Sequence, residues 1–256
     1  MKANLHTHTF RCGHAVGTEE EYVRTAIAEG MEVLGFSDHS PHPFRNGYES
    51  RVRMKLDQLE DYVNTVLTLR KKYAGQIRIP LGLELEYFPG MYPELMEILK
   101  DYPFDYLLLA QHFLEDMRGR QFMGVMNGDD ELLDAYCRRT MDAMNLGVFT
   151  YFAHPDYINY SGDPAYYRKT IRQLCREANS CAVPLEINLL GVREGRHYPN
   201  PAFWEIAAEE GCTAVLGWDA HSPRHLHCPE AEDSARRMAE RLGLKVVDCV
   251  PLRPVR

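Results

Sequence analysis

The sequence predicts an α/β fold built on parallel strands, and two regularities carry this prediction. Seven short β-rich runs alternate with stretches whose apolar residues recur at helical spacing. The runs are apolar at successive positions, as in Tyr106–Ala110, which is typical of a sheet covered on both faces. Strands separated by helices form parallel sheets, because a parallel neighbour is reached only through a crossover connection. A closed barrel and a doubly wound open sheet both satisfy this pattern.

The individual elements are bounded by Gly, Pro or polar turn residues, and several helices open on an N-cap residue or an early proline. The expected strands are Lys2–His6, Val33–Phe36, Ile77–Leu85, Tyr106–Ala110, Val148–Ala153, Pro184–Ile187 and Thr213–Gly217. The expected helices are Thr18–Glu29, Leu56–Tyr73, Tyr92–Leu99, Glu131–Leu146, Ala165–Asn179 and Pro201–Glu210. No repeat or Gly/Ser linker interrupts the chain, so we expect residues 1–256 to form a single domain. The connections 40–76 and 111–147 are long enough to build the rim of a site.

Composition excludes several classes of protein. The 29 Lys and Arg residues against 37 Asp and Glu residues give a net charge of −8, so we expect no nucleic-acid partner. No apolar run approaches the roughly 20 residues of a membrane span, and Met1–His6 leaves no room for a signal peptide, so we expect a cytoplasmic protein without a membrane partner. The 7 cysteines lack a C-x-x-C pair, which indicates reduced thiols and argues against a thiolate zinc site.

Potential metal ligands follow the ends of six of the expected strands. They are His6 and His8, Asp38 and His39, Glu84, His112, His154, and Asp219 and His221. In a parallel α/β fold the loops after the carboxyl ends of the strands share one face, so these side chains should converge. Imidazole and carboxylate ligands without thiolate suit a hydrolytic site for zinc, manganese or iron. The sequence therefore predicts a metal-dependent hydrolase.

The number of such residues exceeds what one ion can use. With His14, which lies in a turn, and without Asp38, nine side chains are available as ligands, and two or three ions sharing a bridging carboxylate would use them. A cluster of cations would stabilise both an attacking hydroxide and the charge that develops on a phosphoryl group. The run Gly82–Glu86 alternates, and spacing alone leaves open whether Glu84 or Glu86 points into the site.

At these residues the sequence resembles the PHP (polymerase and histidinol phosphatase) superfamily, in its histidinol-phosphate phosphatase branch. The matching stretches are His6–His8 with Cys12–His14, Phe36–His39 with Pro41, Gly82–Glu84, Gln111–Phe113, Ala153–Pro155 and Asp219–Pro223. The resemblance implies a distorted (β/α)7 barrel with its active site at the carboxyl ends of the strands. It also implies three divalent metal ions, whether zinc, manganese or iron. Carried over by motif, their ligands are His6, His8, Glu84 and Asp219 for one ion, Glu84, His112 and His154 for the second, and His14, His39 and His221 for the third.

A phosphate monoester needs positive charge beyond the metals, and the arginine fork matches phosphate oxygens. The segment after the sixth expected strand resembles the substrate-binding loop of the family, and we expect Arg193, Arg196 and His197 to contact phosphate there. His42 lies in the long segment after the second strand and is a further candidate, with Arg45, Arg51 and Arg53 near the same rim. We expect a metal-activated hydroxide to attack phosphorus directly, with Asp219 or His197 as the general acid.

The resemblance implies hydrolysis of L-histidinol phosphate to L-histidinol and phosphate in histidine biosynthesis. Other functions stay open at this stage. A PHP phosphoesterase with another or a broad small-molecule specificity would use the same metal cluster, because the cluster explains phosphate-ester hydrolysis and not which alcohol leaves. An amidohydrolase-like enzyme typically carries a carboxylated Lys where this chain has Glu84, and a regulatory module with a decayed site would lack several ligands. The oligomeric state cannot be read from the sequence.

Overall fold

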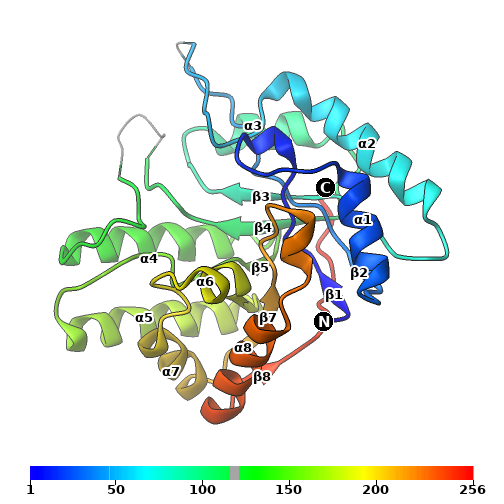
Figure 1. Cartoon of the computed structure of the whole chain (residues 1–256). Coiled ribbons are helices and arrows are strands. Elements are labelled where there is room, and N and C mark those ends of the chain that lie inside the picture. The colour runs from blue at the N-terminus through cyan, green and yellow to red at the C-terminus, as the bar shows by residue number, and fades with distance from the viewer. Residues whose placement is uncertain (46, 116–120, 256) are drawn as a thin grey trace.

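The computed structural model describes residues 1–45, 47–115 and 121–255, and its strands are parallel (Figure 1). Strand β1 (Ala3–Asn4) pairs with β2 (Val33–Leu34). A larger sheet has the order β3 (Gly82–Glu86), β4 (Tyr106–Ala110), β5 (Phe149–Phe152), β6 (Leu185–Asn188), β7 (Thr213–Gly217) and β8 (Lys245–Val246). The predicted α/β fold with a parallel sheet is confirmed. Residues 46 and 116–120, inside the two long connections, lie outside the described part.

Isolated parallel bridges join the two sheets on both sides. Val33 pairs with Arg78, Phe36 with Leu81 and His39 with Glu84, so the chain around β2 runs beside the chain around β3. On the other side, Thr7 pairs with Ala220, which places the residues after β1 beside those after β7. The bridge between Thr7 and Ala220 brings the carboxyl ends of β1 and β7 together, and these ends carry the first and last ligand motifs of the predicted site.

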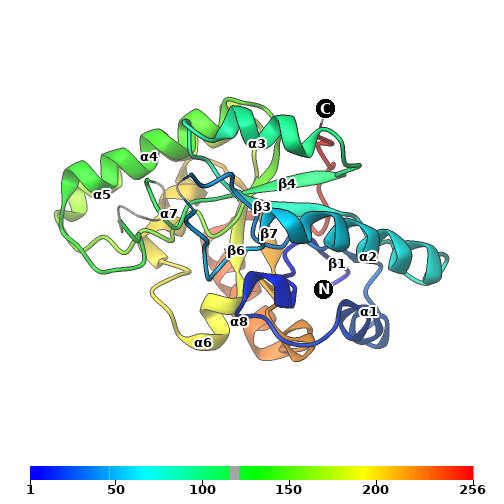
Figure 2. The same cartoon turned by 90° about the horizontal axis from the view of Figure 1, so that it is seen from above.

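The helices follow the strands in alternation. They are α1 (Glu19–Ala28), α2 (Leu59–Lys72), α3 (Tyr92–Leu99), α4 (Asp130–Met144), α5 (Pro164–Ser180), α6 (Leu189–Glu194), α7 (Pro201–Glu209) and α8 (Pro229–Leu242). Short 3₁₀ turns occupy η1 (Phe10–Cys12), η2 (Leu56–Gln58) and η3 (Pro223–Leu226). Helices α1 and α2 lie on the opposite side of the strands from α4 and α5 (Figures 1 and 2). Among the described residues, no helix combines the length and the apolar composition needed to cross a bilayer.

Local chemistry explains where several helices begin. Thr18 and Glu21 form a capping box at the start of α1, in which each side chain bonds the backbone N–H of the other. Asp129, Asp163 and Asn200 cap α4, α5 and α7 through side-chain oxygens that accept backbone N–H groups. These are the N-cap residue types from which the sequence predicts helix starts.

The structure departs from the expected elements in several places, and helix α8 is one element that was not expected. The expected strand Ile77–Leu85 begins only at Gly82, because Arg78 and Leu81 pair through isolated bridges instead of a continuous ladder. The expected loop after the sixth strand folds at once into α6, since Asn188 caps it by accepting the Gly191 N–H at 3.1 Å. Strand β8 was not expected, and its two residues are too short for an alternation to be visible.

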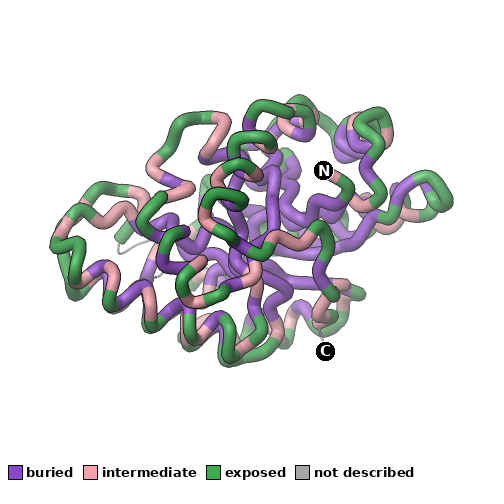
Figure 3. The backbone as a smooth tube through the Cα atoms, turned by 90° about the horizontal axis from the view of Figure 1, so that it is seen from below, coloured by how far each residue is buried: buried purple, intermediate pink, exposed green. Residues whose placement is uncertain are grey.

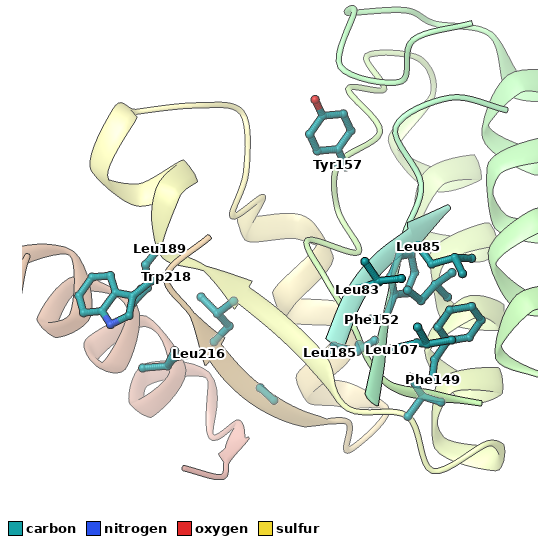
Figure 4. Packing of buried hydrophobic residues seen from close by; sticks show 14 of the residues in the cluster. Leu83, Leu85, Leu107, Phe149, Phe152, Tyr157, Leu185, Leu189, Leu216 and Trp218 are labelled. Carbon is teal, nitrogen blue, oxygen red and sulfur yellow. The ribbon is translucent and has the colours of Figure 1, made fainter. Parts of the chain in front are cut away.

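Each face of the sheet packs against an apolar core. The strands are therefore apolar at successive positions, because residues on both faces are buried. Leu107 and Leu109 of β4 belong to the large core beneath the helices, where Figure 4 shows Leu107 with Leu83, Leu85 and Phe152. The alternate residues of β4 belong to a smaller core formed by the other face. That core comprises Leu5, Tyr106, Leu108, Ala110, Tyr151, Ala153, Val215 and Val250. Buried residues accordingly concentrate along the strands and exposed ones along the outer helices (Figure 3).

Candidate metal centre

The backbone brings the first and last ligand motifs together before any side chain is considered. The His8 N–H donates to the Ala220 carbonyl at 2.9 Å, and the Ala220 N–H donates to the His6 carbonyl at 3.1 Å. His6 and His8 therefore lie beside Asp219 and His221. Asp219 has φ of 48° and His154 has φ of 32°, values that only a few per cent of non-glycine residues adopt. Such strained backbone concentrates at functional sites, where the surrounding structure holds it.

Glu84 lies at the centre of the cluster. Its Oε1 is 2.9 Å from His154 Nε2 and 3.4 Å from His6 Nε2. Its Oε2 is 2.5 Å from His39 Nδ1. The carboxylate is 1% exposed, so each of its oxygens faces imidazole nitrogen and not water. The two oxygens of Glu84 therefore face different imidazoles.

Asp219 is the second carboxylate of the cluster and lies close to His6 and His8. Its Oδ1 is 3.0 Å from His8 Nε2 and 3.6 Å from His6 Nε2. Ligand atoms of His6, His8 and Asp219 all lie within 4.8 Å of one another, and the same holds for the set of His6, Glu84 and His154. His112 joins this side of the cluster, with its Nε2 3.9 Å from Glu84 Oε1.

Two imidazoles at the mouth of the cluster face each other through their lone pairs. His14 Nδ1 lies 2.9 Å from the Cys12 carbonyl and His221 Nδ1 lies 3.1 Å from the Asp219 carbonyl, so each Nδ1 carries the donated hydrogen in the neutral ring. The two Nε2 atoms, left as acceptors, are 3.0 Å apart. A cation bound here would offset the repulsion of these lone pairs, and His39 completes a group of three possible ligands.

Buried atoms without hydrogen bonds test whether the residues fit metal ions. Within the described chain, His6 Nε2, Glu84 Oε2 and Asp219 Oδ1 are buried and make no hydrogen bond. Leaving such groups unsatisfied is expensive, and three of them converging on one space indicate a missing partner that accepts lone pairs. Divalent cations fit this donor set of imidazole nitrogens and carboxylate oxygens.

The pKa values of the carboxyl groups in the cluster are consistent with cation binding. Burial opposes the ionised form of Glu84 and Asp219, but the surrounding histidines outweigh it and hold the pKa of each carboxyl well below its usual range. Burial lowers the pKa of His112 to about 3. At two histidines the nearby carboxylates outweigh burial: Glu186, Asp219 and Glu84 hold the pKa of His6 well above its usual range, and Asp219 and Asp38 raise the pKa of His8 to about 9. At neutral pH both carboxylates are ionised, as cation binding requires.

The family model of the PHP domain matches residues 4–189. The chain belongs to the PHP domain family. It is 31% identical over 228 residues to a protein of Deinococcus radiodurans named as a probable histidinol-phosphatase, covering 85% of both chains. It is 25% identical over 255 residues to a protein of Schizosaccharomyces pombe with the same name, covering 88% of this chain and 82% of that one. The chain is therefore a histidinol-phosphatase-like PHP enzyme.

A solved structure shares the fold of this PHP domain protein. The histidinol phosphate phosphatase of Lactococcus lactis, crystallised with zinc, L-histidinol and phosphate, superposes with a TM-score of 0.73. The match covers 96% of this chain and 95% of that one at 20% sequence identity. At that identity the likeness establishes the common fold.

Glu84 and Glu86, which spacing in the sequence does not distinguish, have different partners in the structure. Glu86 Oε1 accepts the Phe113 N–H at 2.9 Å and lies 3.1 Å from His112 Nδ1, and its other oxygen pairs with Arg53. Glu86 thus points behind His112 and holds that ring, while Glu84 faces the histidines. An alternating strand places the two carboxylates on one face, and only packing separates their roles.

A cavity of about 490 Å³ opens onto the metal centre of the PHP domain. Its floor includes His39, Glu84 and Asp219. Its walls are aromatic and basic, and comprise Phe113, Phe122, Tyr157, Tyr198, Arg53, Arg196, Arg224 and His225. His225 was not among the predicted site residues, although it follows His221 by four positions; its Nδ1 accepts the His221 N–H at 3.1 Å.

The predicted phosphate-binding residues are distributed unevenly around this cavity. Arg196 lines it, with Nη1 donating to Tyr198 Oη at 2.9 Å. Arg193 lies behind the wall and donates to His225 Nδ1 at 3.0 Å. His197 is half-buried outside the lining, with Nε2 2.7 Å from the Tyr157 carbonyl. His42 is buried against Phe44 and Phe88 and lines a different hollow near Tyr48.

Proposed function

We propose that this PHP enzyme hydrolyses a phosphate monoester with the help of three divalent metal ions, and that its substrate is L-histidinol phosphate. In this proposal residues 1–256 form one domain, a distorted (β/α)7 barrel closed by the bridges between the ends of β1 and β7. The observation that carries the proposal is the convergence of nine ligand-type side chains, among which two imidazole lone pairs face each other at 3.0 Å.

The proposed ligand sets follow the groups in the cluster. His6, His8, Glu84 and Asp219 hold one ion, Glu84, His112 and His154 the second, and His14, His39 and His221 the third. Zinc, manganese and iron all suit these ligands. Bound ions of this kind lower the pKa of water and neutralise charge on a phosphoryl group.

The side chains of the chain supply the remaining chemistry. Asp219 lines the cavity beside the ligand cluster, so its carboxylate is placed to take the proton that the attacking water loses. The same carboxyl can then pass this proton to the leaving alkoxide oxygen. His197 is the weaker candidate for this second step, because its Nε2 is engaged by the Tyr157 carbonyl.

Arg196 is proposed to bind phosphate directly. Its Nε and Nη2 contact Glu194 Oε2 at 2.9 and 2.6 Å, which holds the planar fork at the edge of the cavity. Arg193 acts one layer further out by holding His225. The aromatic wall formed by Phe113, Phe122 and Tyr157 suits the flat imidazole ring of the proposed substrate.

A substrate panel tests this function. Purified protein, loaded with metal, is assayed against histidinol phosphate, p-nitrophenyl phosphate, sugar phosphates and mononucleotides. We expect the highest kcat/KM for histidinol phosphate; a flat profile contradicts the assigned substrate, and absence of all turnover contradicts the assigned reaction.

Two variants connect the reaction to the cluster. His8→Ala and Asp219→Ala are expected to abolish p-nitrophenyl phosphate turnover while far-ultraviolet circular dichroism stays like that of the parent. Both lose a ligand-type side chain from the same group. Full turnover in either variant after metal loading would exclude the proposed role of that group.

A further inference from the structure

We propose that Glu186 is a positioning residue that fixes three ligand residues of the metal centre at once, with Asn188 as its intermediary. The inference rests on the proposed metal centre and goes beyond its ligand set. Both residues lie on β6, at the carboxyl end of the strand, and both are no more than 1% exposed. Neither belongs to the ligand sets above.

The Glu186 carboxylate is surrounded by hydrogen-bond donors. Oε1 lies 2.8 Å from His6 Nδ1 and 3.3 Å from Tyr151 Oη. Oε2 accepts the His154 N–H at 3.0 Å and the Asn188 amide at 2.9 Å. An ionised carboxylate is acceptor-only and offers about four lone-pair positions, so it matches four donors. A side-chain amide in the same place would turn an NH₂ group toward two of them.

This environment determines the tautomer of His6. Because Glu186 cannot donate when ionised, the hydrogen between the two groups belongs to His6 Nδ1. In the neutral ring, the form that binds a metal ion, the His6 lone pair is then on Nε2, which lies 3.4 Å from Glu84 Oε1 and 3.6 Å from Asp219 Oδ1. A carboxylate behind a ligating imidazole also raises the basicity of the coordinating nitrogen.

Asn188 extends the same network to Asp219. Its Nδ2 donates to Asp219 Oδ2 at 3.2 Å as well as to Glu186, while its Oδ1 accepts the Gly191 N–H at the start of α6. The cap on α6 thereby fixes which end of the amide faces the carboxylates. Glu186 and Asn188 together hold the His6 ring, the backbone of His154 and the carboxylate of Asp219.

The test measures metal binding without substrate. Zinc affinity and stoichiometry of Glu186→Gln are determined by competition with a chromophoric chelator, and the cobalt(II) form is examined by visible absorption. We expect about 10- to 100-fold weaker binding of at least one ion, the usual effect of removing such a partner, with a changed cobalt spectrum. Excess metal should restore kcat, with KM for p-nitrophenyl phosphate unchanged.

A matched control separates positioning from general damage. Asp156→Asn makes the same chemical change in a carboxylate that is 1% exposed, but Asp156 accepts from the Asn200 N–H and Trp204 Nε1–H instead of a ligand ring. We expect its metal affinity to stay within about twofold of the parent. Equal weakening in Glu186→Gln and Asp156→Asn overturns the proposal, as does parental affinity with a parental cobalt spectrum in Glu186→Gln.

A second variant decides the matter if Glu186→Gln does not fold. Asn188→Ser keeps an oxygen that caps α6 and removes the amide between Glu186 and Asp219. Weaker zinc binding supports the proposal, and unchanged binding refutes it. In the parent protein, metal binding without phosphatase activity would refute only the proposed function. Phosphatase activity in the parent together with unchanged metal binding in Glu186→Gln would refute only the role of Glu186.

Discussion

At the residue scale, the metal centre depends on groups that are not ligands. Gly217 illustrates this: it lies on β7 opposite Asn188, and a Cβ built on it would overlap the Glu186 carboxylate. No positive φ requires glycine at this position. The close approach of Glu186 therefore explains why glycine is there.

Gly217→Ala is expected to push Glu186 away from His6. Overpacking of this kind costs about 1–3 kcal/mol of stability, and metal affinity should fall in parallel because His6 loses its partner. Thermal melting and chelator competition measure the two effects. Gly90→Ala is the control, since a Cβ there meets no atom within 4 Å; equal behaviour of the two variants would contradict the close-approach argument.

The raised pKa of His8 leads to a second prediction at this scale. The pKa of the metal-free His8 ring is raised to about 9, so the ring is protonated at lower pH, whereas a metal ion binds only the neutral imidazole. Metal binding at pH 7 should therefore release a proton and strengthen as pH rises toward 9. Calorimetric titration in two buffers of different ionisation enthalpy counts the protons. Binding that is independent of both pH and buffer would contradict the prediction.

At the scale of the element, β4 shows how one strand serves two cores. Tyr106 is fully buried on its inner face, with its hydroxyl 2.7 Å from the Leu5 carbonyl and 3.0 Å from the Phe36 carbonyl. Its ring occupies the space that side chains at Gly35 and Gly82 would fill. Tyr106 thus connects β4 with the segments that follow β1 and β2.

Gly82→Ala is expected to destabilise the protein by about 1–3 kcal/mol, because its methyl group overlaps the Tyr106 ring. The same change in a Tyr106→Leu background should cost much less, since leucine leaves room for the methyl group. Urea denaturation of the four proteins in this double-mutant cycle measures the coupling. Additive effects would show that the ring is not the obstacle.

At the scale of the whole molecule, the metal centre joins segments from β1 to the end of β7. His6, Glu84, His154 and Asp219 are separated by up to 213 positions yet share buried contacts. Ions bound there would crosslink the fold, so their binding energy would add to folding stability.

Chelation is expected to lower the melting temperature. One site saturated at about 1,000 times its Kd contributes about 4 kcal/mol, which corresponds to roughly 8–16 °C for a chain of this size. Differential scanning calorimetry before and after dialysis against a chelator measures the shift. Returning zinc or manganese should restore the original value, and identical melting in all three samples would contradict a metal-crosslinked fold.

The sequence by itself determined the parallel α/β fold, most strand positions and the residue types that follow each strand, because these depend on local periodicity and turn chemistry. Tertiary structure decided which carboxylate serves which role. Glu84 and Glu86 share a strand face and look equivalent in the sequence, but Arg53 and His112 engage one of them. The facing lone pairs of His14 and His221, and the donors around Glu186, likewise arise from contacts between distant segments. Such contacts depend on packing in three dimensions, which no local pattern encodes.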